Sequence, residues 1–211
     1  MNVASRMARQ TGLPVLVPDY PLAPASRCPA ALTDARAAWA HLLDCGLPPE
    51  RIVIAGDSAG GGLAVALAQS LAGEVEQPAA VVVFSPWVDL SLTGETICSL
   101  ASADPVLSVD YLGWAARTYL GGRIATDPEA SPLFGDFAEF PPLLIQAGGR
   151  EILLDDAIRL ATAARATGTD VRLELEPELW HAWQLFAGLL PEADSALARA
   201  AKFIDARLPA R

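Results

Sequence analysis

The chain has 211 residues, 52% of them hydrophobic and 19% charged, and this balance predicts a single globular domain with a large core. A net charge of −10 argues against nucleic acids and anionic membrane surfaces as partners. We find no signal-peptide pattern and no apolar run long enough to span a membrane. The three cysteines are far apart and lack metal-ligand spacing, so we expect a reducing cytoplasmic location without a metal or cofactor.

The first third of the chain alternates between helical and extended patterns. Residues 4–10 predict a short helix, and residues 13–17 form an apolar run that predicts a strand. A loop rich in proline, residues 21–29, separates this strand from the next element. Residues 29–44 carry apolar side chains at helical spacing and end before a glycine, which predicts a longer helix.

The middle of the chain predicts two buried strands and two helices. These elements are strand 52–55, helix 63–71, strand 79–84 and helix 110–120. The second helix lies in a long excursion, residues 88–141, and Ser108 is suited to cap it. Connections of that length usually carry function and do not serve only to link elements.

The last third repeats the alternation of strands and helices. Residues 143–147 predict a strand and residues 155–167 a helix. Residues 171–176 alternate apolar and charged side chains, which predicts a strand at the edge of the sheet, and residues 191–208 predict a final helix. The whole pattern predicts an α/β fold: a mostly parallel sheet with helices on both faces and reactive groups at the carboxyl ends of its strands.

A candidate nucleophile lies between the strand at 52–55 and the helix that follows it. Residues 56–60 read G-x-S-x-G, and the strand–turn–helix context is that of a nucleophile elbow, which presents Ser58 above the sheet. We expect Gly56 and Gly60 to be required because the two flanking backbones leave no room for a Cβ. The N–H of Ala59 is a candidate oxyanion-hole donor. The alternative, a phosphate-binding turn, would favour a lysine after the glycines, and none is present.

A serine nucleophile requires a base, and the chain contains two histidines. His41 lies within a predicted helix, where a packing or surface role is expected. His181 follows the last predicted strand, at the edge where Ser58 is expected, so we assign it as the base. Its neighbour Trp180, together with Trp87 and Trp183, is a candidate for lining an acyl pocket, although tryptophans beside a strand end are more often core residues.

The base in turn requires a carboxylate. Glu151 comes just after the strand at 143–147 and its glycine turn, whereas Asp155 and Asp156 begin the next helix, where acidic residues also serve as caps. We therefore assign Glu151 as the acid and keep Asp155 as the alternative. The chain order Ser, Glu, His is the order found in α/β-hydrolases.

The sequence resembles the hormone-sensitive-lipase-like branch of the α/β-hydrolase esterases, family IV. The matching segments are DYPLAP at 19–24, GDSAGG at 56–61, SPWVDL at 85–90, SPL at 131–133 and EILLD at 151–155. The resemblance implies a catalytic triad of Ser58, Glu151 and His181. It also implies hydrolysis of short- to medium-chain acyl esters, with lactones as a further substrate class, through an acyl-enzyme. In some members of the family it implies homodimers formed through the last strand and helix.

One departure from the family concerns the oxyanion hole. The family carries an H-G-G-G loop ahead of the D-Y-R-L-A-P motif, and these 211 residues contain no such loop. The chain therefore resembles the C-terminal two-thirds of the family fold, without the cap and three earlier strands. Either the start site is internal to a longer gene or this is a truncated copy. We expect a weak esterase, the alternative being a catalytically inactive hydrolase-like fragment. A serine peptidase on the same fold is less well supported, because nothing indicates an extra domain that would select a peptide chain.

Overall fold

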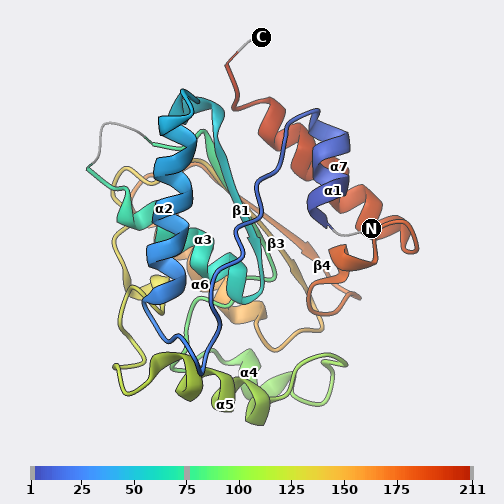
Figure 1. The fold of residues 1–211 in the computed structure, drawn as a ribbon. Helices are drawn as coiled ribbons and strands as arrows, with labels where there is room; N and C mark the ends of the chain where they lie inside the picture. The colour runs from blue at the N-terminus through green and yellow to red at the C-terminus, as the bar shows by residue number, and fades with distance from the viewer. Residues whose placement is uncertain (1–2, 74–76, 210–211) are drawn as a thin grey trace.

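The computed structural model describes residues 3–73 and 77–209 (Figure 1). Within them, four strands form one parallel sheet in the order β1-β2-β3-β4. The strands are β1 (Val53–Asp57), β2 (Ala80–Phe84), β3 (Leu143–Gly148) and β4 (Val171–Glu176). Because all neighbouring pairs are parallel, the four carboxyl ends lie at the same edge of the sheet. The parallel sheet is thus confirmed, as is the edge position of β4.

Helices cover both faces of this sheet (Figure 1). One face carries α2 (Ala30–Asp44), α3 (Ala59–Ser70) and α6 (Leu154–Ala166), and the other carries α1 (Val3–Thr11) and α7 (Pro191–Asp205). The alternation of side chains along β2 explains how one strand serves both layers. Val81 and Val83 belong to the cluster with α2, α3 and α6, whereas Val82 and Phe84 belong to the cluster with α7.

The excursion after β2 forms a third apolar cluster of its own. It contains α5 (Val109–Leu120), whose N-terminal cap is Ser108 as predicted: the Ser108 hydroxyl accepts a hydrogen bond from the N–H of Tyr111. The excursion also contains α4 (Thr96–Ser99) and the 3₁₀ turn η2 (Pro132–Phe134), neither of which the sequence pattern had predicted. The remaining 3₁₀ turns are η1 (Pro49–Arg51) and η3 (Trp183–Phe186).

A buried carboxyl group fastens the start of the excursion to α6. Asp156 accepts hydrogen bonds from the N–H groups of Val88, at 2.9 Å, and Asp89, at 3.0 Å. Burial, together with the nearby Asp89 carboxylate, raises the pKa of Asp156 to about 7, against the lowering effect of these two hydrogen bonds. Asp89 in turn forms an ion pair with Arg159 of α6 at 2.8 Å. The Asp156 carboxylate therefore links α6 to the start of the excursion.

The strand predicted at residues 13–17 is wrong. The segment has no strand conformation, and Val15, Leu16 and Val17 are 45%, 51% and 67% exposed. An apolar run forms a strand only where a neighbouring strand accepts and donates its ladder hydrogen bonds, and Pro14 and Pro18 lack the N–H that such a ladder needs. In the described part of the chain, β1 therefore keeps an unpaired outer edge.

None of the helices in residues 3–73 and 77–209 combines the length and apolar character needed to cross a bilayer.

Candidate active site

Ser58 occupies the turn between β1 and α3, as the G-x-S-x-G pattern predicted. Its backbone has φ 53° and ψ −122°, a conformation that residues other than glycine rarely adopt and that costs free energy. Hydrogen bonds to neighbouring segments hold it there: the Ser58 N–H donates to the Phe84 carbonyl at 2.9 Å, and the Ser58 carbonyl accepts from the Trp87 N–H at 3.0 Å. The end of β2 therefore holds the strained turn at the carboxyl edge of the sheet.

The glycines of the elbow differ in why they are needed. A Cβ on Gly56 would lie 2.1 Å from the carbonyl oxygen of Gly60, so Gly56 is required as expected. A Cβ on Gly60 would meet nothing within 4 Å, so the expectation of a crowded Gly60 is wrong. The close approach involves the backbone of Gly60 and not the position where its side chain would be. The second crowded glycine is Gly62, where a Cβ would lie 2.2 Å from the Trp87 carbonyl oxygen.

This difference predicts opposite effects of two glycine-to-alanine substitutions. We expect Gly60→Ala to keep or slightly raise the melting temperature, because Gly60 lies in the first turn of α3 with room for a Cβ, and alanine loses less backbone freedom on folding than glycine. We expect Gly62→Ala to lower it by several degrees, because the new methyl group must displace backbone. Thermal unfolding followed by circular dichroism provides the measurement. Equal destabilisation by the two substitutions would contradict this account of the elbow.

His181 reaches Ser58 from the loop after β4, residues 177–182, which we call the base loop. Its Nε2 lies 2.9 Å from the Ser58 Oγ, and its side chain is 5% exposed. Ala182, the next residue, has a φ of 54°, so the chain turns sharply just after the imidazole. The other histidine, His41, lies on the exposed side of α2 with its Nε2 3.7 Å from the Cys45 Sγ. The structure thus brings together the serine and the histidine that were predicted to meet.

Two glycines allow the base loop to lie directly on the turn that carries Glu151. A Cβ on Gly148 would lie 2.4 Å from the carbonyl oxygen of Leu179, and a Cβ on Gly149 would lie 2.4 Å from that of Pro177. The N–H of Arg150 donates to the same Leu179 carbonyl at 3.0 Å. The glycine turn after β3 therefore brings the acid and the base within reach of each other.

Glu151 is fully buried, and its Oε2 lies 3.5 Å from the Nδ1 of His181. This separation exceeds a hydrogen bond, and both Nδ1 and the Glu151 Oε1 are buried without a hydrogen-bond partner among the described residues. Catalytic hydrogen bonds are commonly long in unliganded structures. Asp155, the alternative acid, lies in the first turn of α6 and accepts a hydrogen bond from the N–H of Glu95 at 3.0 Å. The structure thus places Glu151 next to His181, whereas the Asp155 carboxylate is used in the excursion.

Sequence reasoning did not identify Ser85 as part of this site. It follows β2, is fully buried and has a φ of 46°. Its hydroxyl donates a hydrogen bond to the Glu151 Oε2 at 2.7 Å and accepts one from the N–H of Ala182 at 2.9 Å. The available signal was its position directly after a buried strand, in the S-P-W segment, at the edge where the other site residues gather.

The start of α3 supplies backbone donors beside Ser58. Ala59 and Gly60 are its first residues, so their N–H groups have no acceptor within the helix. The positive end of the helix dipole lies at the same point, which favours negative charge there. Ala59 is exposed and Ser58 half-buried, so a ligand can approach both. This arrangement suits the negatively charged oxygen of a carbonyl group that the Ser58 Oγ has attacked.

Two of the tryptophans considered for a substrate pocket lie in different surroundings. Trp87 is buried in the apolar cluster of the excursion, with Ile152 and Leu153, the two residues that follow Glu151. Trp180 is half-buried and contacts Phe186 edge to face, with ring centroids 5.7 Å apart. Of the two, Trp180 is the one that a ligand could reach.

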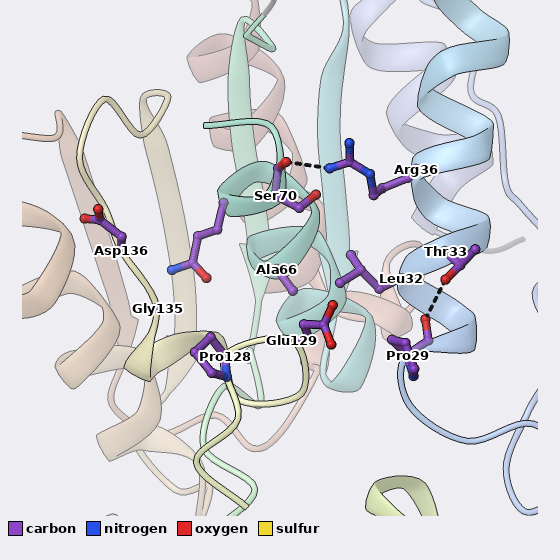
Figure 2. A pocket seen from close by; sticks show the side chains of 11 residues that line it. Pro29, Leu32, Thr33, Arg36, Ala66, Ser70, Pro128, Glu129, Gly135 and Asp136 are labelled. Atoms are coloured by element: carbon purple, nitrogen blue, oxygen red, sulfur yellow. Dashed lines mark hydrogen bonds between the residues drawn. The ribbon is translucent and has the colours of Figure 1, made fainter. Parts of the chain in front are cut away.

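A cavity of about 470 Å³ lies away from these residues, between α2, α3 and the segment 128–136 (Figure 2). The part of α3 that lines it is the C-terminal half, from Ala66 to Ser70, whereas Ser58 precedes the other end of the helix. The Arg36 side chain spans part of it and donates to the Ser70 carbonyl at 2.5 Å. Ser58, Glu151 and His181 are absent from its lining, so this cavity is separate from the candidate active site.

The fold and the candidate site together define a class. A parallel sheet with helices on both faces, a serine on a strand-to-helix elbow, and an acid and a histidine from later loops are the features of α/β-hydrolases. Comparison with known proteins agrees: a family model described as "alpha/beta hydrolase fold" matches residues 1–185. The chain belongs to this family, in the branch related to hormone-sensitive lipase.

Several relatives illustrate this membership. An acetyl-hydrolase of Streptomyces hygroscopicus is 42% identical over 96% of this chain and 68% of its own length, and an esterase of Acinetobacter venetianus is 38% identical over 93% and 66%. The crystal structure of an esterase from the bacterial hormone-sensitive lipase family has a TM-score of 0.95 and 44% identity, covering 98% of this chain and 70% of that one. This chain thus spans about two thirds of the length of these relatives.

Proposed function

We propose that this chain carries the catalytic triad of a carboxylic-ester hydrolase, with Ser58 as nucleophile, His181 as base and Glu151 as acid. The observation that carries the proposal is the 2.9 Å separation between the Ser58 Oγ and the His181 Nε2, across 123 residues of sequence. The names of the relatives, acetyl-hydrolase and esterase, support ester hydrolysis as the reaction. Esters of short to medium acyl chains, and lactones, are the proposed substrates.

The chemistry follows from the geometry in two steps. His181 Nε2 takes the hydroxyl proton of Ser58 while Oγ attacks the ester carbonyl carbon, and the negative charge that develops on the carbonyl oxygen faces the Ala59 N–H. The imidazolium then gives its proton to the departing alcohol, leaving an acyl group on Ser58. In the second step, His181 takes a proton from water, the resulting hydroxide attacks the acyl carbon, and Ser58 recovers its proton as the acid is released. In both steps the Glu151 carboxylate stabilises the imidazolium that forms on His181.

The oxyanion hole limits the expected rate of residues 1–211. The sequence contains no H-G-G-G segment, so the Ala59 N–H is the donor that we propose within it. Loss of one oxyanion donor typically lowers kcat by roughly 10²- to 10³-fold. We therefore propose a slow hydrolase, and the competing reading is an inactive hydrolase-like fragment that has kept the triad geometry.

A fluorophosphonate probe separates the two readings. We expect purified 1–211 to form one covalent adduct, detected as a mass increase and mapped by peptide mass spectrometry to Ser58. Heat-unfolded protein, treated identically, controls for general serine reactivity and should remain unlabelled. Turnover of p-nitrophenyl butyrate is expected to be slow but dependent on Ser58. Folded protein that forms no adduct after prolonged exposure would favour the inactive fragment.

A further inference from the structure

The carboxyl end of β2 carries a strained residue that the proposed reaction leaves without a role. Ser85 has a φ of 46°, in the left-handed region that favours glycine, and its N–H donates to the Gln146 carbonyl at 2.7 Å. Glycine would adopt this conformation at no steric cost. Strained residues cluster where a site requires a particular side chain in a particular place. The question is therefore what the hydroxyl group of Ser85 contributes.

The hydrogen bonds of that hydroxyl determine where its proton points. The Ser85 Oγ accepts a hydrogen bond from the N–H of Ala182 at 2.9 Å, and an amide nitrogen can only donate. The single hydroxyl proton is then free for the Glu151 Oε2, 2.7 Å away. Among the described residues, the Ser85 hydroxyl is the one group that makes a hydrogen bond to this fully buried carboxylate, because the His181 Nδ1 lies farther away, at 3.5 Å. Burial of a carboxylate is costly unless donors surround it, so the hydroxyl offsets part of that cost.

The same two contacts join the acid to the base. Oε2, the oxygen that Ser85 holds, is also the oxygen 3.5 Å from the Nδ1 of His181. Ala182, whose N–H Ser85 also holds, follows His181 directly and has a φ of 54°. One side chain from β2 thus sets the position of the carboxylate and of the turn that aims the imidazole.

We propose that Ser85 is a positioning residue for the triad: its hydroxyl holds the Glu151 carboxylate and the Ala182 amide together, so that His181 keeps its proton on Nδ1 and presents a bare Nε2 to Ser58. This inference rests on the proposed function, because it assigns Ser85 a role toward the same reaction. Ser85 does not touch the reacting atoms. It acts by keeping the Glu151 carboxylate and the His181 ring in position relative to each other.

Ser131 provides a matched control for the loss of a buried hydroxyl. It is also fully buried, its hydroxyl donates to the Ala125 carbonyl at 2.6 Å, and it accepts from the Leu90 N–H at 2.8 Å. These partners belong to the excursion and include neither the acid nor the base loop. Ser131→Ala therefore removes the same number of buried hydrogen bonds without loosening the triad.

The experiment compares Ser85→Ala, Ser85→Gly and Ser131→Ala with the unmodified chain. We expect both Ser85 variants to react with the fluorophosphonate probe roughly 10- to 100-fold more slowly, as small displacements of reacting groups have effects of this size. Ser131→Ala should react at the unmodified rate. Glycine adopts the positive φ of residue 85 without strain, so the melting temperature of Ser85→Gly should be at least that of Ser85→Ala. If both variants label slowly although their melting temperatures differ, the loss of rate comes from lost positioning and not from lost stability.

A spectroscopic measurement tests the positioning role even if the chain proves inactive. The ¹⁵N chemical shifts of the His181 ring show which nitrogen carries the proton, and His41→Gln assigns the two histidines. We expect the Nδ1–H form in the unmodified chain and in Ser131→Ala, and a reduced share of it in both Ser85 variants. If the share of the Nδ1–H form of His181 is the same in the Ser85 variants as in the unmodified chain, the proposal is overturned. It is also overturned if the unmodified chain is active and the Ser85 variants label at the same rate. If neither the unmodified chain nor any variant is labelled, but the Ser85 variants show the reduced share of the Nδ1–H form, the positioning role stands and the proposed function fails.

Discussion

Replacing His181 by glutamine is expected to slow acylation of Ser58 by at least about 10³-fold, because His181 is the one base among the described residues that hydrogen-bonds to the Ser58 hydroxyl and can take its proton. A glutamine side chain can still hydrogen-bond to the Ser58 Oγ but cannot accept a proton at neutral pH. The second-order rate of labelling by a fluorophosphonate probe measures attack by the same Oγ, on phosphorus in place of a carbonyl carbon, and does not depend on the later release of product.

The second histidine of the chain serves as the control. His41 lies on the exposed side of α2 and contacts Cys45, the residue that follows this helix, so His41→Gln should label at the unmodified rate. Circular dichroism should show that both variants are folded. A His181→Gln variant that labels as fast as His41→Gln would remove the histidine from the mechanism.

Replacing Glu151 by glutamine is expected to lower the labelling rate by roughly 10³- to 10⁴-fold, the loss typical when a triad carboxylate becomes an amide. The change preserves the size of the side chain and leaves an oxygen that can accept a hydrogen bond from the Ser85 hydroxyl. It removes the negative charge that stabilises the imidazolium once Ser58 has lost its proton. Because Glu151 is fully buried, solvent screens that charge very little, and a large effect follows.

Asp155→Asn provides the comparison, because Asp155 is the acid that the sequence left as the alternative. Its carboxylate accepts the N–H of Glu95, a hydrogen bond that an asparagine oxygen also accepts, so the variant should fold and label normally. If Asp155→Asn lost the rate and Glu151→Gln retained it, the acid would be misassigned.

Much of this protein follows from local sequence. Continuous apolar runs predicted β1 to β3 and an alternating run predicted β4, while helical spacing predicted helices that pack on them, because each pattern commits one or both faces of a segment to burial. The elbow at Ser58 was also readable, since the strand, glycine turn and helix are contiguous. The apolar run at residues 13–17 shows where such reasoning fails: a strand needs a neighbouring strand, and a pattern alone does not indicate whether one is present.

Other features depended on contacts between distant segments. The sequence already favoured Glu151 over Asp155, but the closeness of Glu151 to His181 depends on the contact between the glycine turn after β3 and the base loop. The role that we propose for Ser85 depends on its contacts with Glu151 and Ala182, which lie 66 and 97 positions further along the chain. Sequence alone predicted the four strands of the sheet and the longer helices, and it marked where along the chain the candidate serine, acid and histidine lie. Only the tertiary structure decided which side chains meet at the carboxyl edge. The pattern of apolar and polar residues that favours a strand or a helix lies within a short segment, whereas hydrogen bonds between side chains depend on how distant segments pack together.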